Sequence, residues 1–402
     1  MTFIRMTTRH ALILLMLALM AASIAGAAKA ESFEEKKRQA NDIAVTIVVS
    51  GISCTCARFA EDIRNVVNDL RPDGIRVLPV LGVGGLQNAN DVLFLKNIDM
   101  GVVDEDNLRL LKKKDPRLYA NIEQQIQYIT KLYNSEFHVL ARNDIKSYAD
   151  LRGKKVNFNL KDSQTEVSAD LVFDLLKLNV EKSNYDNDEA IKKLRDGDIS
   201  AMIVLSGAPQ AALAKVKKED QVHFLPLDQS SLPGYDVSPI FVNYLPAELT
   251  HEEYPNLIAE GETVPTFANR ALLVAYAWPE HSPRYKRLEK FVQEFFGKID
   301  QFQTGARHPK WKEINLAAEI PGWTRFRPAS DWLASHQSSA ASSQREQASL
   351  ASSDLKFAFD KFIANYAASS GGKALTSSDR EKLFARFLRY METQKVIGQS
   401  TR

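Results

Sequence analysis

Three short segments hold residues that could bind a small ligand, mainly through their backbone. They are residues 50–56 (SGISCTC), 82–85 (GVGG) and 161–165 (KDSQT). Each follows a strand-like run and precedes a helix-like one, so each is expected at the carboxyl end of a strand, where ligands gather in open α/β sheets. The N–H groups at a helix N-terminus suit carboxylates and other anions, and glycine lets the backbone approach a ligand closely.

Each segment also has a purely structural interpretation. Ser163 and Glu166 have the spacing of a capping box, so Ser163 could serve only its own helix. The pair Gly84-Gly85 is also typical of an ordinary tight turn, and Gly207-Ala208-Pro209 could simply end a strand. Both interpretations stay open at this point, since capping a helix does not exclude contact with a ligand.

The sequence contains only weak and incomplete signatures of catalysis and of metal binding. The sequence contains no GxSxG, Walker or HExxH motif. Cys54 and Cys56, the only cysteines, could hold a soft metal, but two thiolates are half of a site, and a disulfide between them would close a small ring. A cysteine nucleophile would need a base such as His138 or His223 beside it. We therefore expect no enzyme activity, catalytic residue, metal site or cofactor, and keep a thiol or metal protein as a distant alternative.

Composition limits the class of protein. The 402 residues are 45% hydrophobic and 25% charged, which is normal for a globular protein with buried cores. At roughly 150 residues per domain, this length suggests two or three folding units. The net charge of +2 gives no argument for nucleic acid or for an anionic membrane as a partner.

The first 30 residues have the pattern of a signal peptide. Arg5, Arg9 and His10 precede an apolar run over residues 11–26, and Ala28-Lys29-Ala30 follows as a cleavage site. The apolar run is shorter than the roughly 20 residues of a membrane-spanning helix, with an uncleaved anchor as the alternative. We expect an exported, periplasmic protein that does not span the membrane after signal cleavage.

Strand-like and helix-like stretches alternate through the body of the chain. The predicted strands are 44–49, 75–81, 98–103, 137–142, 155–160, 200–205 and 271–277, and the predicted helices are 59–70, 88–96, 148–153, 163–178, 188–196 and 285–296. Repeated strand–loop–helix units predict an α/β fold with a mostly parallel sheet. Beyond them, residues 334–353 predict a Ser/Ala-rich linker and residues 354–402 a helical hairpin tail.

The order of these segments resembles the TAXI family of TRAP-transporter solute receptors over about residues 41–333. The matching segments are 51–56, 84–88 (GGLQN), 97–104 (NIDMGVVD), 138–156, 163–167 (SQTEV), 206–209 (SGAP) and 264–266 (VPT). Each motif is weak alone, and it is their shared order that carries the resemblance. The most similar stretch is 138–156, which contains HVLAR and IKSYADLRGKKV.

The resemblance implies a type II periplasmic binding protein, with two α/β lobes joined by two crossing strands that act as a hinge. It places the crossings near 138–143 and 264–273, with lobe 1 formed by 31–138 and 265–333 and lobe 2 by 139–264. Family members bind small carboxylates such as glutamate or 2-oxo acids by lobe closure, and deliver them to a TRAP membrane permease. By loop position, the resemblance implies ligand-binding roles for Ser53, Cys54, Thr55, Gly84, Gly85, Ser163, Gln164, Thr165, Gly207 and Ala208.

The sequence departs from the family pattern in its ligand loops. Val83 and Leu86 replace a Thr and a Ser on either side of the glycine pair, and Gln164 replaces a glycine. Burying a ligand carboxylate without hydrogen-bond donors costs several kcal/mol. The loss of these hydroxyls would therefore weaken the binding of a carboxylate ligand. Two hypotheses follow: a receptor for a small, anionic organic solute, and an exported interaction protein of the same fold whose degenerate pocket has given way to a protein partner.

Overall fold

The computed structural model describes residues 32–71 and 73–337, which belong to two compact units, residues 1–44 and 45–402. The described part of the first unit is helix α2 (Phe33–Asp42), which Ser32 and Glu35 begin with a reciprocal capping box. Within the described ranges, no helix combines the length and the apolar character needed to cross a membrane. The predicted signal peptide, most of the predicted linker and the helical hairpin tail lie outside the described residues.

The second unit is built on one mixed sheet. Its main strand order is β2-β1-β3-β10-β4-β7-β5-β6, and β8, β9 and β11 pair beside the two longest strands. The strands are β1 (Ala44–Val49), β2 (Arg76–Leu81), β3 (Met100–Asp104), β4 (Ile126–Arg142), β5 (Lys155–Asn157), β6 (Glu181–Ser183), β7 (Ala201–Ser206), β8 (Val222–Phe224), β9 (Leu245–Thr250), β10 (Thr263–Tyr276) and β11 (Thr324–Arg325).

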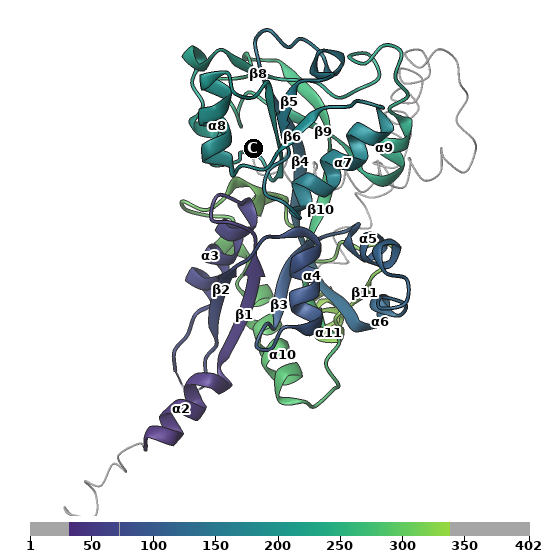
Figure 1. The fold of residues 1–402 in the computed structure, drawn as a ribbon. Helices are drawn as coiled ribbons and strands as arrows, with labels where there is room; N and C mark the ends of the chain where they lie inside the picture. Colours follow the sequence, from purple (N-terminus) through teal and green to yellow (C-terminus); the bar gives the residue numbers. More distant parts are fainter. Residues whose placement is uncertain (1–31, 72, 338–402) are drawn as a thin grey trace, which may run out of the picture. The chain divides into compact units, whose positions relative to one another are not determined.

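Helices cover this sheet and occupy most of the connections between its strands (Figure 1). They are α3 (Thr55–Val67), α4 (Gly85–Phe94), α5 (Asn107–Lys114), α6 (Ile122–Gln125), α7 (Gln164–Leu175), α8 (Asn187–Asp196), α9 (Ser238–Asn243), α10 (Pro283–Gly297) and α11 (Arg327–Gln337). The sequence order of strand, loop and helix therefore matches the predicted α/β pattern. The sheet is mixed, however, and not mostly parallel as predicted, because β4 runs antiparallel to β7 and β10, and β10 also runs antiparallel to β3 and β9.

Strands β4 and β10 divide the sheet into two lobes. Strand β4 pairs with β10 along residues 126–136, and with β7 along residues 136–141. Strand β10 pairs with β9 along residues 263–268, and with β3 along residues 271–275. Each lobe thus has the same strand order, β2-β1-β3 in the first and β6-β5-β7 in the second, followed by the two strands that cross between them. This confirms the predicted two-lobed, type II architecture.

The first half of β4 was not predicted, because its residues do not read as a strand. Thr130, Lys131, Asn134, Ser135 and Glu136 interrupt the apolar pattern, yet all are buried. These polar side chains lie where the strand passes between the lobes, and both of its faces are covered there. The strand therefore begins at residue 126, whereas its apolar signal begins only at 137.

A large aromatic cluster holds the start of α3 in place in the first lobe. The ring of Phe59 stacks on Trp311 at 4.1 Å between centroids and contacts Tyr133 at 4.5 Å. The indole N–H of Trp311 donates to the buried carboxylate of Asp62 at 2.9 Å. Burial of each such side chain stabilises the fold by about 1.5–3 kcal/mol, so residues 309–313 anchor the helix whose N-terminus carries the first predicted ligand loop.

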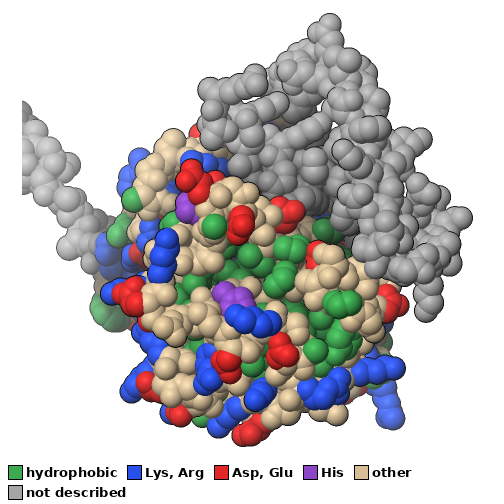
Figure 2. Space-filling model, turned by 90° about the horizontal axis from the view of Figure 1, so that it is seen from above, with side chains coloured by type: hydrophobic (Ala, Val, Ile, Leu, Met, Phe, Trp, Pro, Cys, Tyr) green, Lys and Arg blue, Asp and Glu red, His purple; other side chains and the backbone are tan. Residues whose placement is uncertain are grey.

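The second lobe has its own core beneath α7. Phe137 stacks on Phe267 at 4.6 Å and Tyr244 stacks on Phe267 at 4.5 Å, so both crossing strands are tied to α9. On the face of this lobe seen from above in Figure 2, basic and acidic side chains are interspersed around a patch of hydrophobic ones. The electrostatic potential of that face is therefore not dominated by charge of one sign.

Candidate functional site

A cavity of about 230 Å³ lies between the two lobes. Its walls include, from the first lobe, residues 50–54, Gly84, Gly85 and Asp104 and, from the second, residues 163–165, 186–188 and 204–206. The cavity lies at the carboxyl ends of β1, β3 and β7, which is where open α/β sheets place their ligands. Its size suits a small organic molecule and not a peptide or a lipid.

Four helices begin at the cavity. The N-cap residues of α3, α4, α7 and α8 are Cys54, Gly84, Ser163 and Asp186, and all four line it. Ser163 Oγ accepts the N–H of Glu166 at 3.3 Å, as the capping-box spacing predicts. Among the described residues, no group accepts the backbone N–H of Gln164 or Thr165 in the first turn of α7. Helix N-termini of this kind stabilise negative charge.

The structure brings seven of the ten predicted ligand residues to the cavity wall. They are Ser53, Cys54, Gly84, Gly85, Ser163, Gln164 and Thr165. The other three, Thr55, Gly207 and Ala208, lie beside it: Thr55 Oγ1 donates to the carbonyl oxygen of Gly207 at 2.7 Å, and the N–H of Ala208 donates to Glu136 Oε2 at 2.8 Å. Their positions tie the lobes to each other and to the crossing strand.

Gly85 is required by the approach of the two lobes. Its φ is +55°, a region that L side chains rarely adopt, and an added Cβ would lie 2.7 Å from the backbone nitrogen of Gln164. Gly84 has a φ of +88°, and its added Cβ would lie 2.8 Å from Ser50 Oγ. The glycine pair is therefore more than a tight turn, because it allows the α4 and α7 N-termini to meet.

Several hydrogen bonds cross between the lobes around this contact, and we call their residues the interlobe seam. Gln164 Oε1 accepts from Asn107 Nδ2 at 2.6 Å, and Gln164 Nε2 donates to Asp106 Oδ1 at 3.0 Å. Ser53 is used twice: its Oγ accepts from Asn187 Nδ2 at 3.1 Å, and its carbonyl oxygen accepts from Gln210 Nε2 at 2.7 Å. The bond of Thr55 to Gly207 also belongs to the seam. Side chains predicted to hold a ligand therefore also hold the lobes together.

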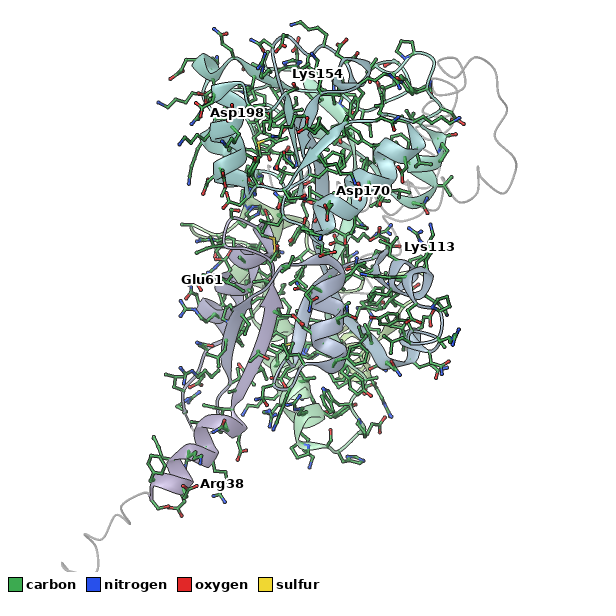
Figure 3. All side chains as sticks on the ribbon, viewed as in Figure 1. Arg38, Glu61, Lys113, Lys154, Asp170 and Asp198 are labelled. Atoms are coloured by element: carbon green, nitrogen blue, oxygen red, sulfur yellow. A yellow bond between two sulfur atoms is a disulfide. The ribbon has the colours of Figure 1, made fainter. Side chains whose placement is uncertain are left out.

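The two cysteines form a disulfide at the cavity wall, near the start of α3 (Figure 3). Cys54 Sγ accepts the N–H of Cys56 at 3.0 Å and so caps α3, while Cys56 Sγ accepts the N–H of Ser50 at 3.2 Å. A soft-metal site or a cysteine nucleophile would need thiolates, which the disulfide does not provide. This pair therefore shapes the wall of the cavity.

A buried group of charges lies next to the point where β4 crosses between the lobes. Lys310 Nζ is 2.7 Å from Glu136 Oε1, 2.8 Å from Glu313 Oε1 and 3.9 Å from Glu253 Oε1. Burial raises the pKa of Glu136 to about 7, although Lys310 opposes this shift. Burial alone would lower the pKa of Lys310, but the three carboxylates raise it, so Lys310 stays charged. The cluster is a fixed ionic link between the crossing strand and both lobes.

Sequence reasoning missed several residues of the cavity. They include Asn88, Asp104, Tyr133, Ser135, Asn159 and Asn187. The signal available for Asp104 was its place at the end of a predicted strand, in the segment NIDMGVVD. Desolvation by the surrounding protein, with a smaller contribution from Asp106, raises the pKa of Asp104 well above its usual value of 3.8.

Comparison with known protein families agrees with this arrangement. Residues 71–286, more than half of the chain, match the sequence profile of the NMT1-like family. The chain belongs to the NMT1-like family. The matched range of this NMT1-like chain includes both crossing strands, the glycine pair and all of the second lobe's contribution to the cavity. The profile does not single out the TAXI receptors, so that part of the resemblance stays a prediction.

Solved structures similar to this NMT1-like chain share little sequence with it. The periplasmic aliphatic sulphonate-binding protein SsuA of Escherichia coli is 14% identical, with 64% of this chain and 75% of that chain covered and a TM-score of 0.34. The substrate-binding protein of an amino acid ABC transporter is 12% identical, with 64% and 96% covered and a TM-score of 0.37. The effector-binding domain of QuiR, in complex with shikimate, is 12% identical, with 63% and 97% covered and a TM-score of 0.38. At these TM-scores, the fold assignment rests on the strand order of the NMT1-like chain itself.

Proposed function

We propose that this NMT1-like protein is an exported solute receptor, which closes its two lobes on a small carboxylate-bearing solute and delivers it to a TRAP-type membrane permease. One observation carries the proposal: four helix N-termini converge on a cavity of about 230 Å³ between lobes that two strands connect. The pattern of residues 1–30 supports export to the periplasm, and the TAXI resemblance supports the TRAP permease as partner.

Binding, and not catalysis, is the role that these groups support. The cavity wall carries hydroxyls, amides and carboxyls, but within the described residues it includes no histidine, no lysine and no free thiol. A nucleophile next to a general base, the usual arrangement for covalent catalysis, is thus not assembled there. The crossing strands instead supply a hinge, so that ligand binding stabilises a closed form that a permease recognises.

A ligand panel tests the proposal directly. The purified protein is screened by thermal shift against amino acids, 2-oxo acids and dicarboxylates. A ligand at about 100 times its Kd adds about 2.7 kcal/mol to the free energy of unfolding, which raises the melting temperature clearly. If isothermal titration confirms a hit with one site per chain, the receptor function stands. A panel without any hit contradicts it.

One specific observation favours the second candidate, an exported interaction protein. Ser53, Thr55 and Gln164 are engaged in hydrogen bonds of the interlobe seam, which reduces the number of side chains left for a solute. In that case a pull-down from a periplasmic extract, with the predicted helical hairpin tail of residues 354–402 present and then deleted, should recover a protein only with the tail present. A transport receptor should keep its solute affinity without the tail.

A further inference from the structure

A second cavity, of about 430 Å³, shares residues 52–54 with the cavity between the lobes, and we call it the outer hollow. Its wall is formed by the ends of β1 and β2, the first turns of α3 and the loop after β7. Two large apolar side chains of this wall, Ile52 and Leu81, are 84% and 58% exposed. Together with Pro79 and Ala211, they give the outer hollow a surface that favours an apolar occupant.

The ionisable side chains of the outer hollow are already paired within the protein. Arg58 Nη2 donates to a backbone carbonyl oxygen at 2.6 Å, and His308 Nε2 donates to another at 3.3 Å. The carboxylate of Glu61, which is labelled in Figure 3, accepts from Arg64 Nε at 2.9 Å. An occupant of the outer hollow would therefore be held mainly by apolar contact and not by charge.

The two sulfur atoms of the disulfide differ in access. Cys54 is half-buried and belongs to the wall of both cavities, whereas Cys56 is 4% exposed and is not part of the outer hollow. In thiol–disulfide exchange, a thiolate attacks one sulfur of the bond and the other sulfur leaves. A thiol that lies in the outer hollow would therefore meet Cys54, and Cys56 would be the leaving group.

The surroundings of Cys56 suit a leaving group. Its Sγ accepts the N–H of Ser50 at 3.2 Å and lies in the first turn of α3, and both features stabilise negative charge on a sulfur. The bond joins residues only two apart, and a disulfide stabilises a fold less when it closes a shorter loop. Opening this bond therefore costs the fold little.

We propose that the outer hollow is a thiol-exchange site, at which the Cys54–Cys56 disulfide captures a cysteine thiol carried by an apolar polypeptide segment. The thiolate of the substrate attacks Cys54 Sγ and forms a new S–S bond with it. The bond between Cys54 and Cys56 breaks, and its electron pair leaves with Cys56 as a thiolate. The substrate sulfur is oxidised and Cys56 is reduced, so the step is balanced without a further oxidant. Because the disulfide is the electrophile, the protein needs neither a free thiol nor a general base, and the site is separate from the cavity for a solute.

The test compares two thiols that differ only in the apolar character of their flanks. The oxidised full-length protein is mixed with the blocked tripeptides Leu-Cys-Leu and Ser-Cys-Ser, quenched with acid, and analysed by mass spectrometry. Leu-Cys-Leu should form the mixed disulfide at least about tenfold faster, because its leucine side chains are buried in the outer hollow. Fragmentation of the adduct should locate the peptide on Cys54, with Cys56 as the free thiol.

Matched variants keep the result interpretable. Ile52→Ser combined with Leu81→Ser should reduce the preference for Leu-Cys-Leu to less than about threefold and keep the wild-type melting temperature, because both side chains are exposed. Leu70→Ser, at a position that is 70% exposed but outside the outer hollow, should leave the preference unchanged.

Single-cysteine variants test the difference in access independently. The free Cys54 of Cys56→Ser should react with an aromatic disulfide reagent at least about tenfold faster than the free Cys56 of Cys54→Ser. Equal rates for the two peptides, an adduct on Cys56, or a disulfide that reacts only in denaturant would overturn the inference. None of these outcomes bears on the receptor function, which the solute panel tests with the disulfide intact.

Discussion

Gln164 of the second lobe accepts a hydrogen bond from Asn107 of the first, with 2.6 Å between Oε1 and Nδ2. The same amide donates to Asp106, so it bridges two residues of the α5 N-terminus. In the TAXI pattern a glycine stands at this position, and the glutamine therefore adds a contact between lobes that a glycine could not make. A double-mutant cycle of Gln164→Ala and Asn107→Ala should show a coupling of about 0.5–1.5 kcal/mol in the free energy of unfolding.

The cycle also has a structural readout. The radius of gyration from small-angle X-ray scattering should rise for Gln164→Ala, since the lobes lose two of the bonds that join them. Additive single effects, together with an unchanged radius, would show that this amide does not hold the lobes together.

Gly85→Ala should hinder lobe closure. The new methyl group would meet the backbone of Gln164 at 2.7 Å, and the φ of +55° disfavours any side chain. We expect solute affinity to fall by at least about tenfold, which corresponds to 1.4 kcal/mol, as measured by titration calorimetry. Gly297→Ala is the matched control, because an added Cβ there has no atom within 4 Å and its φ is not positive. Equal affinities for the two variants would contradict the closure mechanism.

Lys310→Met should destabilise the protein strongly. Glu136 and Glu313 would remain buried without their cation, which typically costs about 3–5 kcal/mol of unfolding free energy. Lys312→Met, two residues away on an exposed position, should change stability by less than about 0.5 kcal/mol. Urea denaturation measures both, and addition of Glu136→Gln to Lys310→Met should restore part of the loss. A Lys310→Met variant as stable as the Lys312→Met control would refute the ionic link.

His138 should make stability depend on pH. It is fully buried, and the carbonyl oxygen of Val204 can only accept, so Nδ1 carries the proton and Nε2 accepts from the Tyr254 hydroxyl at 2.8 Å. Burial lowers the pKa of His138 from 6.5 to about 4. Between these values the unfolded chain binds a proton that the native chain does not, so this contribution is complete above pH 6.5 and is lost as the pH falls toward 4.

The comparison that isolates this residue is wild type against His138→Gln, because Gln keeps a donor and an acceptor but does not titrate. From pH 7 to pH 5, the wild type should lose about 2 kcal/mol more unfolding free energy than the variant. Glu136 and His308, whose pKa values are also shifted, are common to both proteins and cancel. Parallel pH profiles in urea denaturation would show that His138 is not the titrating group.

The α/β pattern and the ligand loops were predictable because they depend on local sequence. A strand and the turn after it are specified by an apolar run that ends at a glycine, as at Gly51 and Gly82. The start of a helix is specified by the capping spacing at Ser163. These local signals located the segments that carry most of the cavity wall. The resemblance then supplied the crossing strands, which no local pattern specifies.

The features that could not be predicted depend on contacts between residues far apart in the sequence. Glu136 lies in a buried strand, and nothing in the sequence near it indicates that the distant Lys310 is its partner. Asp104 reads as an ordinary strand end until the folded chain sets it beside segments 60 residues or more away, such as Gln164. The double use of Ser53 and Gln164, in the cavity wall and in the seam, was likewise invisible before the lobes were brought together.

In each hydrogen bond of the interlobe seam, both the donor and the acceptor belong to the protein. The protein itself therefore supplies part of the free energy that favours lobe closure. A bound solute then has to supply only the rest of the free energy of closure, so a smaller binding free energy is enough to shift the equilibrium from the open to the closed form. The solute concentration that closes the receptor and the choice of solute therefore depend on different residues. Substitutions in the seam would retune the concentration at which the receptor responds, while the cavity residues would keep deciding which solute it accepts.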